Sequence, residues 1–139
     1  MATALALKNV SKSFGAIHIA TGLDLEVRDN EAVGILGPNG AGKTTILGLI
    51  AGTLALDAGS IAFCGREISR LPTHERCRLG IARAYQVPQP FGDMTVFENL
   101  MVAACFGARQ GLVVAQSHCL EILERCGLSS LADARALLG

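Results

Sequence analysis

The residues best suited to chemistry form one glycine-rich stretch in the first third of the chain. Its nine residues are Gly37, Pro38, Asn39, Gly40, Ala41, Gly42, Lys43, Thr44 and Thr45. They fit the pattern G-x-x-x-x-G-K-[ST], the Walker A phosphate loop. Its three glycines can take positive φ, which lets main-chain N–H groups converge on phosphate oxygens. The stretch therefore predicts a cradle for the phosphates of a nucleotide.

The end of this stretch supplies the polar side chains. A helix that begins near Lys43 would add unpaired N–H groups and the positive end of its dipole. In this motif the lysine reaches the β- and γ-phosphates, and the Thr44 hydroxyl can bind Mg²⁺. Thr45 is expected to supply a backbone N–H to the α-phosphate. The alternative is a glycine-rich turn without a ligand, but a first-turn lysine opposes the helix dipole and calls for an anion.

A strand and a helix must flank such a loop to position it. Residues 31–36 (EAVGIL) have the apolar character of a short buried strand. Residues 43–51 (KTTILGLIA) predict a helix with Ile46, Leu47 and Ile50 on one face. Gly52 is placed to cap the end of that helix. Strand, loop and helix follow in the order that the motif requires.

The remaining elements of the first half are mostly short strands. Residues 5–13 and 17–27 alternate apolar and polar side chains and predict two antiparallel strands, separated by Phe14 and Gly15. A turn at residues 57–60 and a strand at residues 61–64 follow the loop helix. Pro72 could open a helix over residues 73–79 that Gly80 would end. Residues 81–85 then predict another short strand.

The second half has a helical pattern. Residues 86–92 (QVPQPFG) form a loop, and Thr95 and Glu98 have the spacing of a capping box that opens a helix toward Cys105. Residues 107–111 break this helix. A further helix ending at Gly127 is expected to place four residues on one face, namely Ala115, Cys119, Ile122 and Cys126. Residues 131–138 are expected to be helical or irregular.

Composition excludes several other functions. The formal net charge is zero, so nothing global favours nucleic acid or an anionic membrane. Uncharged stretches are shorter than the roughly 18 apolar residues of a membrane span. The N-terminus lacks the pattern of a signal peptide, which makes a cytosolic protein the default.

The other titratable side chains do not form a recognisable site. The five cysteines include no C-x-x-C pair, which predicts reduced thiols rather than zinc ligands or disulfides. The three histidines have no partner at metal-ligand spacing. Asp57, Asp93 and Glu98 are isolated carboxylates, Asp57 in a turn and Glu98 at a helix start. No pair of them suggests acid–base catalysis.

Four features in one order resemble the nucleotide-binding domain of ABC transporters. They are the run GPNGAGKTT, the upstream aromatic residue Phe14, Gln86 after ARAY, and the stretch MTVFENL at residues 94–100. The resemblance implies that Phe14 stacks on adenine. It also implies that Gln86 is the Q-loop glutamine, which binds Mg²⁺ and positions water. The alternatives are a core phenylalanine at a strand end and a polar residue at a strand end.

The resemblance implies an α/β fold, a P-loop NTPase core of ABC type with N-terminal antiparallel β strands. The core would span residues 1–90, and residues 91–139 would start the helical subdomain. The sequence lacks the Walker B strand with its Asp-Glu pair, the switch histidine, and the signature motif unless Leu138 and Gly139 begin it. It therefore looks like the N-terminal part of such a domain. Without a Walker B strand the phosphate-loop strand has a bare edge, so we expect this stretch alone to be marginally stable or prone to aggregate.

The wording of SFGAI, ARAYQ and MTVFENLMVAA is most similar to branched-chain amino acid importer ATPases, and related urea or short-amide importers share it. The resemblance implies ATP and Mg²⁺ as cofactors, transmembrane permease subunits and a second ATP-binding subunit in a head-to-tail dimer, and no nucleic acid. It places the protein in the cytoplasm, on the inner face of the membrane. Residues 1–139 should then bind ATP without hydrolysing it. A non-transport ABC module is disfavoured by the compact spacing from Lys43 to Gln86, and a small kinase would not explain MTVFENL.

Overall fold

The computed structural model describes residues 2–136 and divides into two compact units. They are Met1–Arg76 and Cys77–Gly139, and the division falls within a short helix, α2 (Thr73–Arg78). Each unit is described by itself. This division does not test the boundary expected at residue 90 between core and helical subdomain, which stays a prediction.

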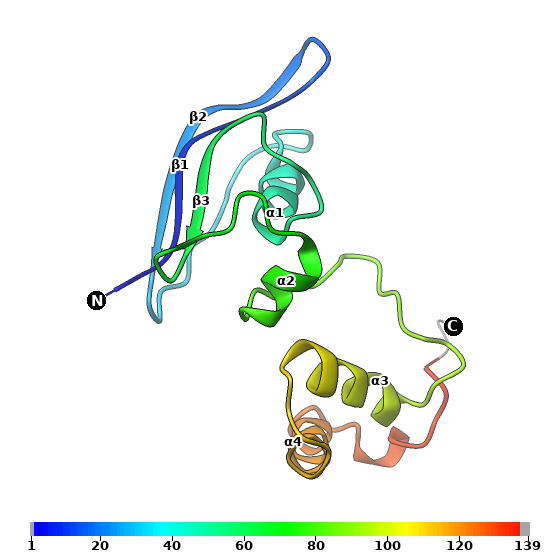
Figure 1. Ribbon diagram of the computed structural model, residues 1–139. Coiled ribbons are helices and arrows are strands. Elements are labelled where there is room, and N and C mark those ends of the chain that lie inside the picture. The colour runs from blue at the N-terminus through cyan, green and yellow to red at the C-terminus, as the bar shows by residue number, and fades with distance from the viewer. Residues whose placement is uncertain (1, 137–139) are drawn as a thin grey trace. The chain divides into compact units, whose positions relative to one another are not determined.

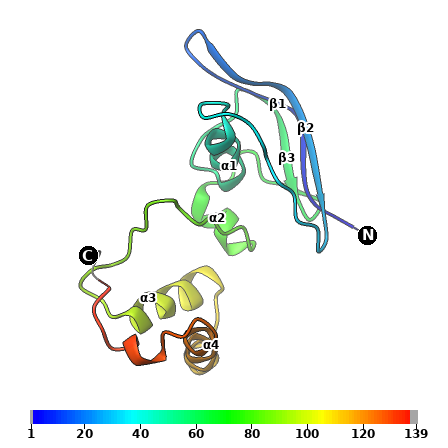
Figure 2. The ribbon, with the colours of Figure 1, turned by 180° about the vertical axis from the view of Figure 1, so that it is seen from behind.

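The first unit is built on an antiparallel sheet. Strands β1 (Thr3–Phe14), β2 (Ile17–Arg28), β3 (Ala58–Phe63) and β4 (Arg66–Glu67) lie in the order β2-β1-β3-β4. Figures 1 and 2 show β1 between its neighbours and helix α1 (Lys43–Ala51) against one face of the sheet. The two predicted N-terminal strands are confirmed. The turn expected at residues 57–60 is shorter, because the strand after it already begins at Ala58.

Two tight turns set the register of this sheet. Phe14 pairs with Ile17 at the end of the first hairpin, and Gly15 between them has a φ of 60°. Phe63 pairs with Arg66 in the second hairpin, whose two turn residues also have positive φ. The core of the unit lies where α1 packs on the sheet, since the fully buried side chains include Leu7, Val10 and Ile61 of the strands and Leu49 of α1.

Helix α1 has the predicted bounds but a different buried face. Gly48, Leu49 and Ala51 are buried, whereas Leu47 is 48% exposed. The predicted face of Ile46, Leu47 and Ile50 is therefore wrong. This helix is apolar on every side, so periodicity cannot select the face that packs. Gly52 does cap the helix, with a φ of 82° and its N–H donated to the Gly48 carbonyl.

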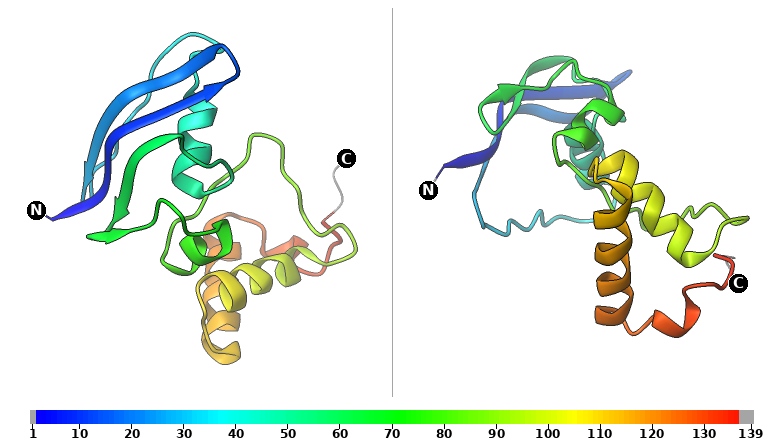
Figure 3. Two further views of the ribbon diagram at one scale, coloured as in Figure 1. Left: turned by 45° about the horizontal axis from the view of Figure 1, so that its top comes forward. Right: turned by 60° about the horizontal axis from the view of Figure 1, so that its bottom comes forward.

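The strand predicted at residues 31–36 does not form. Its residues run in an irregular extended path, with Val33 42% and Leu36 95% exposed. Figure 3 shows this segment crossing from the end of β2 to α1 away from the strands. An apolar run of this kind becomes a strand when parallel neighbours pair with it. Among residues 2–136 the sheet offers antiparallel pairs only.

The second unit is helical. It contains α3 (Val96–Val102), which continues into a π-helical turn (Ala103–Gly107), α4 (Leu112–Arg125) and a 3-10 turn (Ser129–Leu131). Ala104, Ala115 and Cys119 form its buried centre. The capping box at the start of α3 is confirmed, since Thr95 accepts from the Glu98 N–H while Glu98 accepts from the Thr95 N–H. In residues 2–136 no helix is long and apolar enough to cross a bilayer.

Two predictions for this unit need correction. The strand expected at residues 81–85 is irregular, again without a neighbour to pair with among the described residues. On α4, Leu123 is buried and Cys126 is exposed. The buried residues Ala115, Cys119 and Leu123 are four positions apart, and the helix ends at Arg125, so Cys126 lies beyond its buried face. The segment at residues 131–138 agrees with the prediction of helical or irregular chain as far as it is described: a 3-10 turn ends at Leu131 and irregular chain follows to Ala136. Its last two residues lie outside the described part. So do Leu138 and Gly139, the possible start of a signature motif.

Candidate phosphate-binding site

The loop before α1 has the backbone of an anion cradle. Gly40 and Gly42 have φ values of 84° and 83°, whereas Gly37 stays in the ordinary region. A Cβ on Gly42 would overlap Cγ2 of Ile19 on β2. Gly42 therefore satisfies two demands at once, a left-handed backbone and close contact with the sheet. Position 42 accepts glycine alone without strain.

Lys43 lies over the loop that precedes it. Its Nζ donates to the carbonyls of Gly37 and Pro38, both at 2.6 Å. An ammonium group has three donors, so one N–H remains after these two bonds. The Pro38 carbonyl also accepts from the Ala41 N–H at 3.2 Å, which closes the turn. These bonds hold the Lys43 ammonium against the backbone of the loop that precedes α1.

The first turn of α1 has no side-chain cap. Its N-cap is Gly42, and no acidic residue lies in the first turn. The N–H groups at a helix start have no acceptor within the helix, and their dipoles attract an anion. The Thr44 hydroxyl is exposed here. Loop, helix start and lysine together fit the triphosphate of a nucleotide, and a hydroxyl beside the phosphates fits Mg²⁺.

A buried arginine that sequence reasoning missed holds the other end of α1. The Arg76 side chain is 2% exposed and donates to the carbonyls of Leu49 at 2.6 Å and Ile50 at 2.9 Å. It also donates to the carbonyls of Leu71 and Ser69. Burial lowers the pKa of the Arg76 guanidinium from its ordinary value, but an arginine stays charged at neutral pH. A cation on the last carbonyls of a helix complements its dipole.

Phe14 lies at the same end of the hairpin as the phosphate loop. Ile19, which touches Gly42, lies between two β2 residues that pair with Lys12 and Ser13. Phe14 is 48% exposed, which counts against the alternative of a core phenylalanine. The Lys12 Nζ lies 5.2 Å from the centroid of that ring. A ring open to solvent beside the loop fits a stacking role, which stays a prediction.

Gln86 belongs to the other unit, in the irregular segment after residue 80. Its side chain is exposed, and its place beside the phosphate loop stays a prediction. The chain that follows it is fixed at Phe91. The Phe91 N–H donates to Oδ1 of Asn99, and Nδ2 of Asn99 donates back to the Phe91 carbonyl. Asn99, in the stretch MTVFENL, thus fixes the end of the loop that begins at Gln86 by hydrogen bonds to the Phe91 backbone.

Asp57 is not the isolated carboxylate that the sequence indicates. It accepts hydrogen bonds from Lys12 and Ser13, and it forms an ion pair of 2.8 Å with Lys12. The Lys12 hydrogen bond and those from Ser13 lower the pKa of Asp57 to about 2. Among the described residues, no three His, Cys, Asp or Glu side chains form a group that could hold a metal.

A family model described as "ABC transporter" matches residues 20–137. That span includes the loop, α1 and both helices of the second unit. The chain belongs to the ABC transporter family. Its fold is the N-terminal part of the phosphate-loop core of such a protein, as the four sequence features predicted.

The chain is similar to ATP-binding proteins of several different transport systems. The chain is 41% identical over 134 residues to the Nod factor export ATP-binding protein I of Paraburkholderia xenovorans, covering 95% of this chain and 42% of that protein. It is 39% identical over 99 residues to a probable branched-chain amino acid transport ATP-binding protein LivG of Archaeoglobus fulgidus, covering 71% and 38%. It is 37% identical over 131 residues to the lipopolysaccharide export protein LptB of Haemophilus influenzae, covering 93% and 54%. The chain thus spans about half the length of these relatives.

Solved structures agree with the fold. An ATP-binding cassette of an ABC transporter, crystallised in its ADP conformation, matches all of this chain and 60% of its own with a TM-score of 0.79 and 30% identity. A nucleotide-free cassette matches 96% of this chain and 58% of its own, with a TM-score of 0.77 and the same identity.

Proposed function

We propose that the chain is the nucleotide-binding portion of the ATP-binding subunit of an ABC importer for branched-chain amino acids or a related solute. The observation that carries this proposal is the loop itself: left-handed Gly40 and Gly42, an uncapped helix start, and Lys43 held over both. The loop and the helix start offer backbone N–H groups and one cation, and no acidic side chain lies in the first turn of the helix. A triphosphate is the ligand that uses all of these groups.

Each group has a distinct task in the proposed site. The loop N–H groups that have no acceptor within the chain and the third donor of Lys43 hold the phosphates, and Phe14 stacks on the base. Thr44 and Gln86 hold Mg²⁺, which supplies charge neutralisation between the β- and γ-phosphates. Phosphoryl transfer is catalysed mainly by positioning and charge. Residues 1–139 contain no apolar strand ending in Asp-Glu, so by themselves they bind ATP without hydrolysing it.

The partners follow from the same proposal. Transmembrane permease subunits would bind the helical second unit, and a second ATP-binding subunit would close the site head to tail, all on the cytoplasmic face of the membrane. The LivG relative and the sequence wording SFGAI, ARAYQ and MTVFENLMVAA support an amino acid importer. The Nod factor and lipopolysaccharide relatives favour export of a larger solute as the second candidate.

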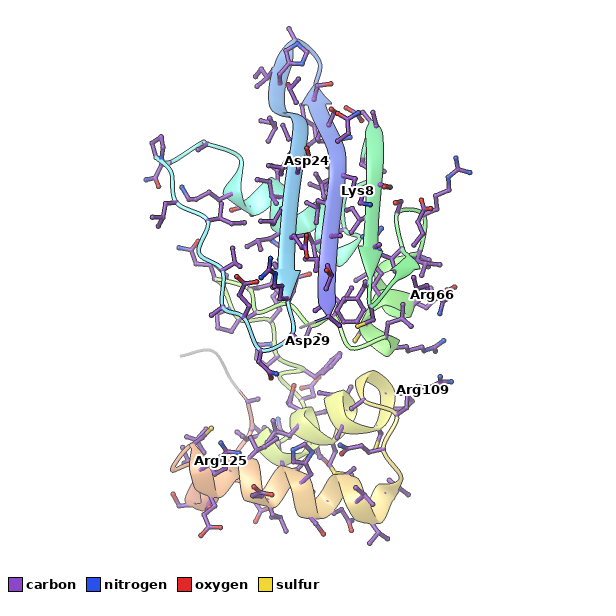
Figure 4. All side chains as sticks on the ribbon, turned by 90° about the vertical axis from the view of Figure 1, so that its left-hand side faces the viewer. Lys8, Asp24, Asp29, Arg66, Arg109 and Arg125 are labelled. Atoms are coloured by element: carbon purple, nitrogen blue, oxygen red, sulfur yellow. The ribbon has the colours of Figure 1, made fainter. Side chains whose placement is uncertain are left out.

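Calorimetric titration with ATP and Mg²⁺ tests the proposed site. Lys43→Ala removes a charged donor, and hydrogen bonds to charged groups are worth about 1.5–3 kcal/mol. We therefore expect its affinity to fall at least about tenfold. Lys8→Ala is the matched control, since Lys8 is exposed on β1 (Figure 4) and takes the same charge change. Equal losses for the two variants, or no binding by the wild type, would refute the proposal.

A further inference from the structure

The carboxylate of Asp57 fixes the backbone just before Phe14. Its Oδ2 accepts from the Ser13 N–H at 2.7 Å and from the Ser13 hydroxyl at 3.0 Å, while its Oδ1 accepts from Lys12 Nζ at 2.8 Å. The Asp57 N–H in turn donates to the Ser11 carbonyl at 2.9 Å. Four hydrogen bonds thus join this one residue to three consecutive residues of β1.

These bonds take the place of a missing strand. Strand β3 begins at Ala58, which lies opposite Ser11, so β1 runs on to Phe14 without a β3 partner. The pairing of β1 with β2 is irregular on both sides of Lys12. A hairpin end with an irregular ladder is weakly specified by its strands alone. The Asp57 side chain therefore sets the conformation of this end.

Lys12 connects the Asp57 carboxylate to the Phe14 ring, because it contacts both. Its side chain is only 14% exposed, so its position is fixed by packing as well as by the Asp57 carboxylate. Its Nζ lies over the ring at 5.2 Å from the centroid. The cation occupies one face of the ring. Phe14 as a whole is 48% exposed, and a flat base could stack on the face of the ring opposite Lys12.

We propose that Asp57 and Lys12 are positioning residues that hold Phe14 as a stacking platform for a purine base, so that the preference for a purine nucleotide over bare polyphosphate depends on them. This inference rests on the proposed nucleotide site. It adds to that site two residues, Asp57 and Lys12, that would influence recognition of the base without contacting the phosphates or the metal.

The test compares two probes, ATP and inorganic tripolyphosphate, each with Mg²⁺, by calorimetry on the whole chain. Stacking makes a modest contribution to affinity, so Asp57→Asn should weaken ATP binding about two- to twelvefold and leave tripolyphosphate binding unchanged. Lys12→Met should do the same. Glu26→Gln is the control, because Glu26 lies on β2 opposite Ala6 and far along the hairpin from Phe14. Unchanged tripolyphosphate binding also shows that each variant keeps a folded loop.

A double-mutant cycle separates positioning from general stability. In a Phe14→Ala background, Asp57→Asn should cost no further ATP affinity, because the platform is already gone. Equal loss for both probes, an unchanged ATP affinity, or a loss that persists without the ring would overturn the inference while leaving the phosphate site standing. A wild type that binds neither probe would refute the proposed function itself, and the inference with it.

Discussion

Arg76→Ala is the substitution for which the structure makes the largest stability prediction. The guanidinium donates to four carbonyls, two at the end of α1 and two in the chain before α2, and it is 2% exposed. Losing one charged hydrogen bond costs about 1.5–3 kcal/mol. The four together would exceed 6 kcal/mol if all acceptors stayed dry.

Water that enters the site would reduce the loss of stability caused by Arg76→Ala. A cavity of about 460 Å³ lies against Arg76 and is also lined by Gly52 and Leu71, so water can reach part of the freed carbonyls. We therefore expect Arg76→Ala to lower the free energy of unfolding by about 3 kcal/mol. Arg76→Lys should cost about half as much, roughly 1.5 kcal/mol, because a compact ammonium has three donors and no planar fork.

Urea denaturation followed by circular dichroism measures these differences. Arg125→Ala is the control, because Arg125 is exposed and forms only a 3.9 Å pair with Glu121 on the same helix. Such a surface pair is worth about 0.3–0.5 kcal/mol. Losses at Arg76 and Arg125 that agree within about 0.5 kcal/mol would refute the conclusion that a buried clamp holds α1.

Three further predictions follow from single contacts. Gly42→Ala should lower the thermal midpoint more than Gly15→Ala, because both glycines have positive φ but only Gly42 lacks room for a Cβ; equal midpoints would count against the close contact. The pKa of Asp57 is about 2 in the folded chain against an ordinary 3.8, so its ionised form stabilises the fold above about pH 4 and this contribution is lost toward pH 2. The difference in urea midpoint between wild type and Asp57→Asn should shrink over that window, and a constant difference would contradict the assignment. Burial raises the pKa of the Cys119 thiol, so iodoacetamide should modify exposed Cys126 much faster than it modifies Cys119. Mass spectrometry of the peptides measures both rates, and equal rates would contradict this prediction.

Local signals in the sequence were sufficient for the features that depend on neighbouring residues. The N-terminal hairpin, the start of α1, its Gly52 cap and the Thr95 capping box need only residues a few positions apart. The positive φ of the loop glycines was predictable for the same reason at two of the three positions, while phosphate binding by the loop stays a prediction. Turns and helix caps depend on the conformation and hydrogen bonds of neighbouring residues, so they can be predicted without knowledge of the tertiary contacts.

Features that depend on distant partners were not predictable. Arg76 reads as an exposed charge on a short helix until the α1 carbonyls are placed beside it. Asp57 reads as a turn residue until the end of β1 is placed against it. The strand expected at residues 31–36 shows the converse, a predicted element that does not form. Its apolar pattern is typical of a buried strand, but no described strand pairs with it. An apolar run defines a strand only together with its neighbours.

Amide chemical shifts recorded while tripolyphosphate and then ATP are added, both with Mg²⁺, test the central claim most directly. The account predicts that tripolyphosphate moves the amide signals of residues 39–45 and that ATP moves these and, in addition, that of Phe14. Amides of residues 39–45 that stay in place while ATP binds elsewhere would contradict it.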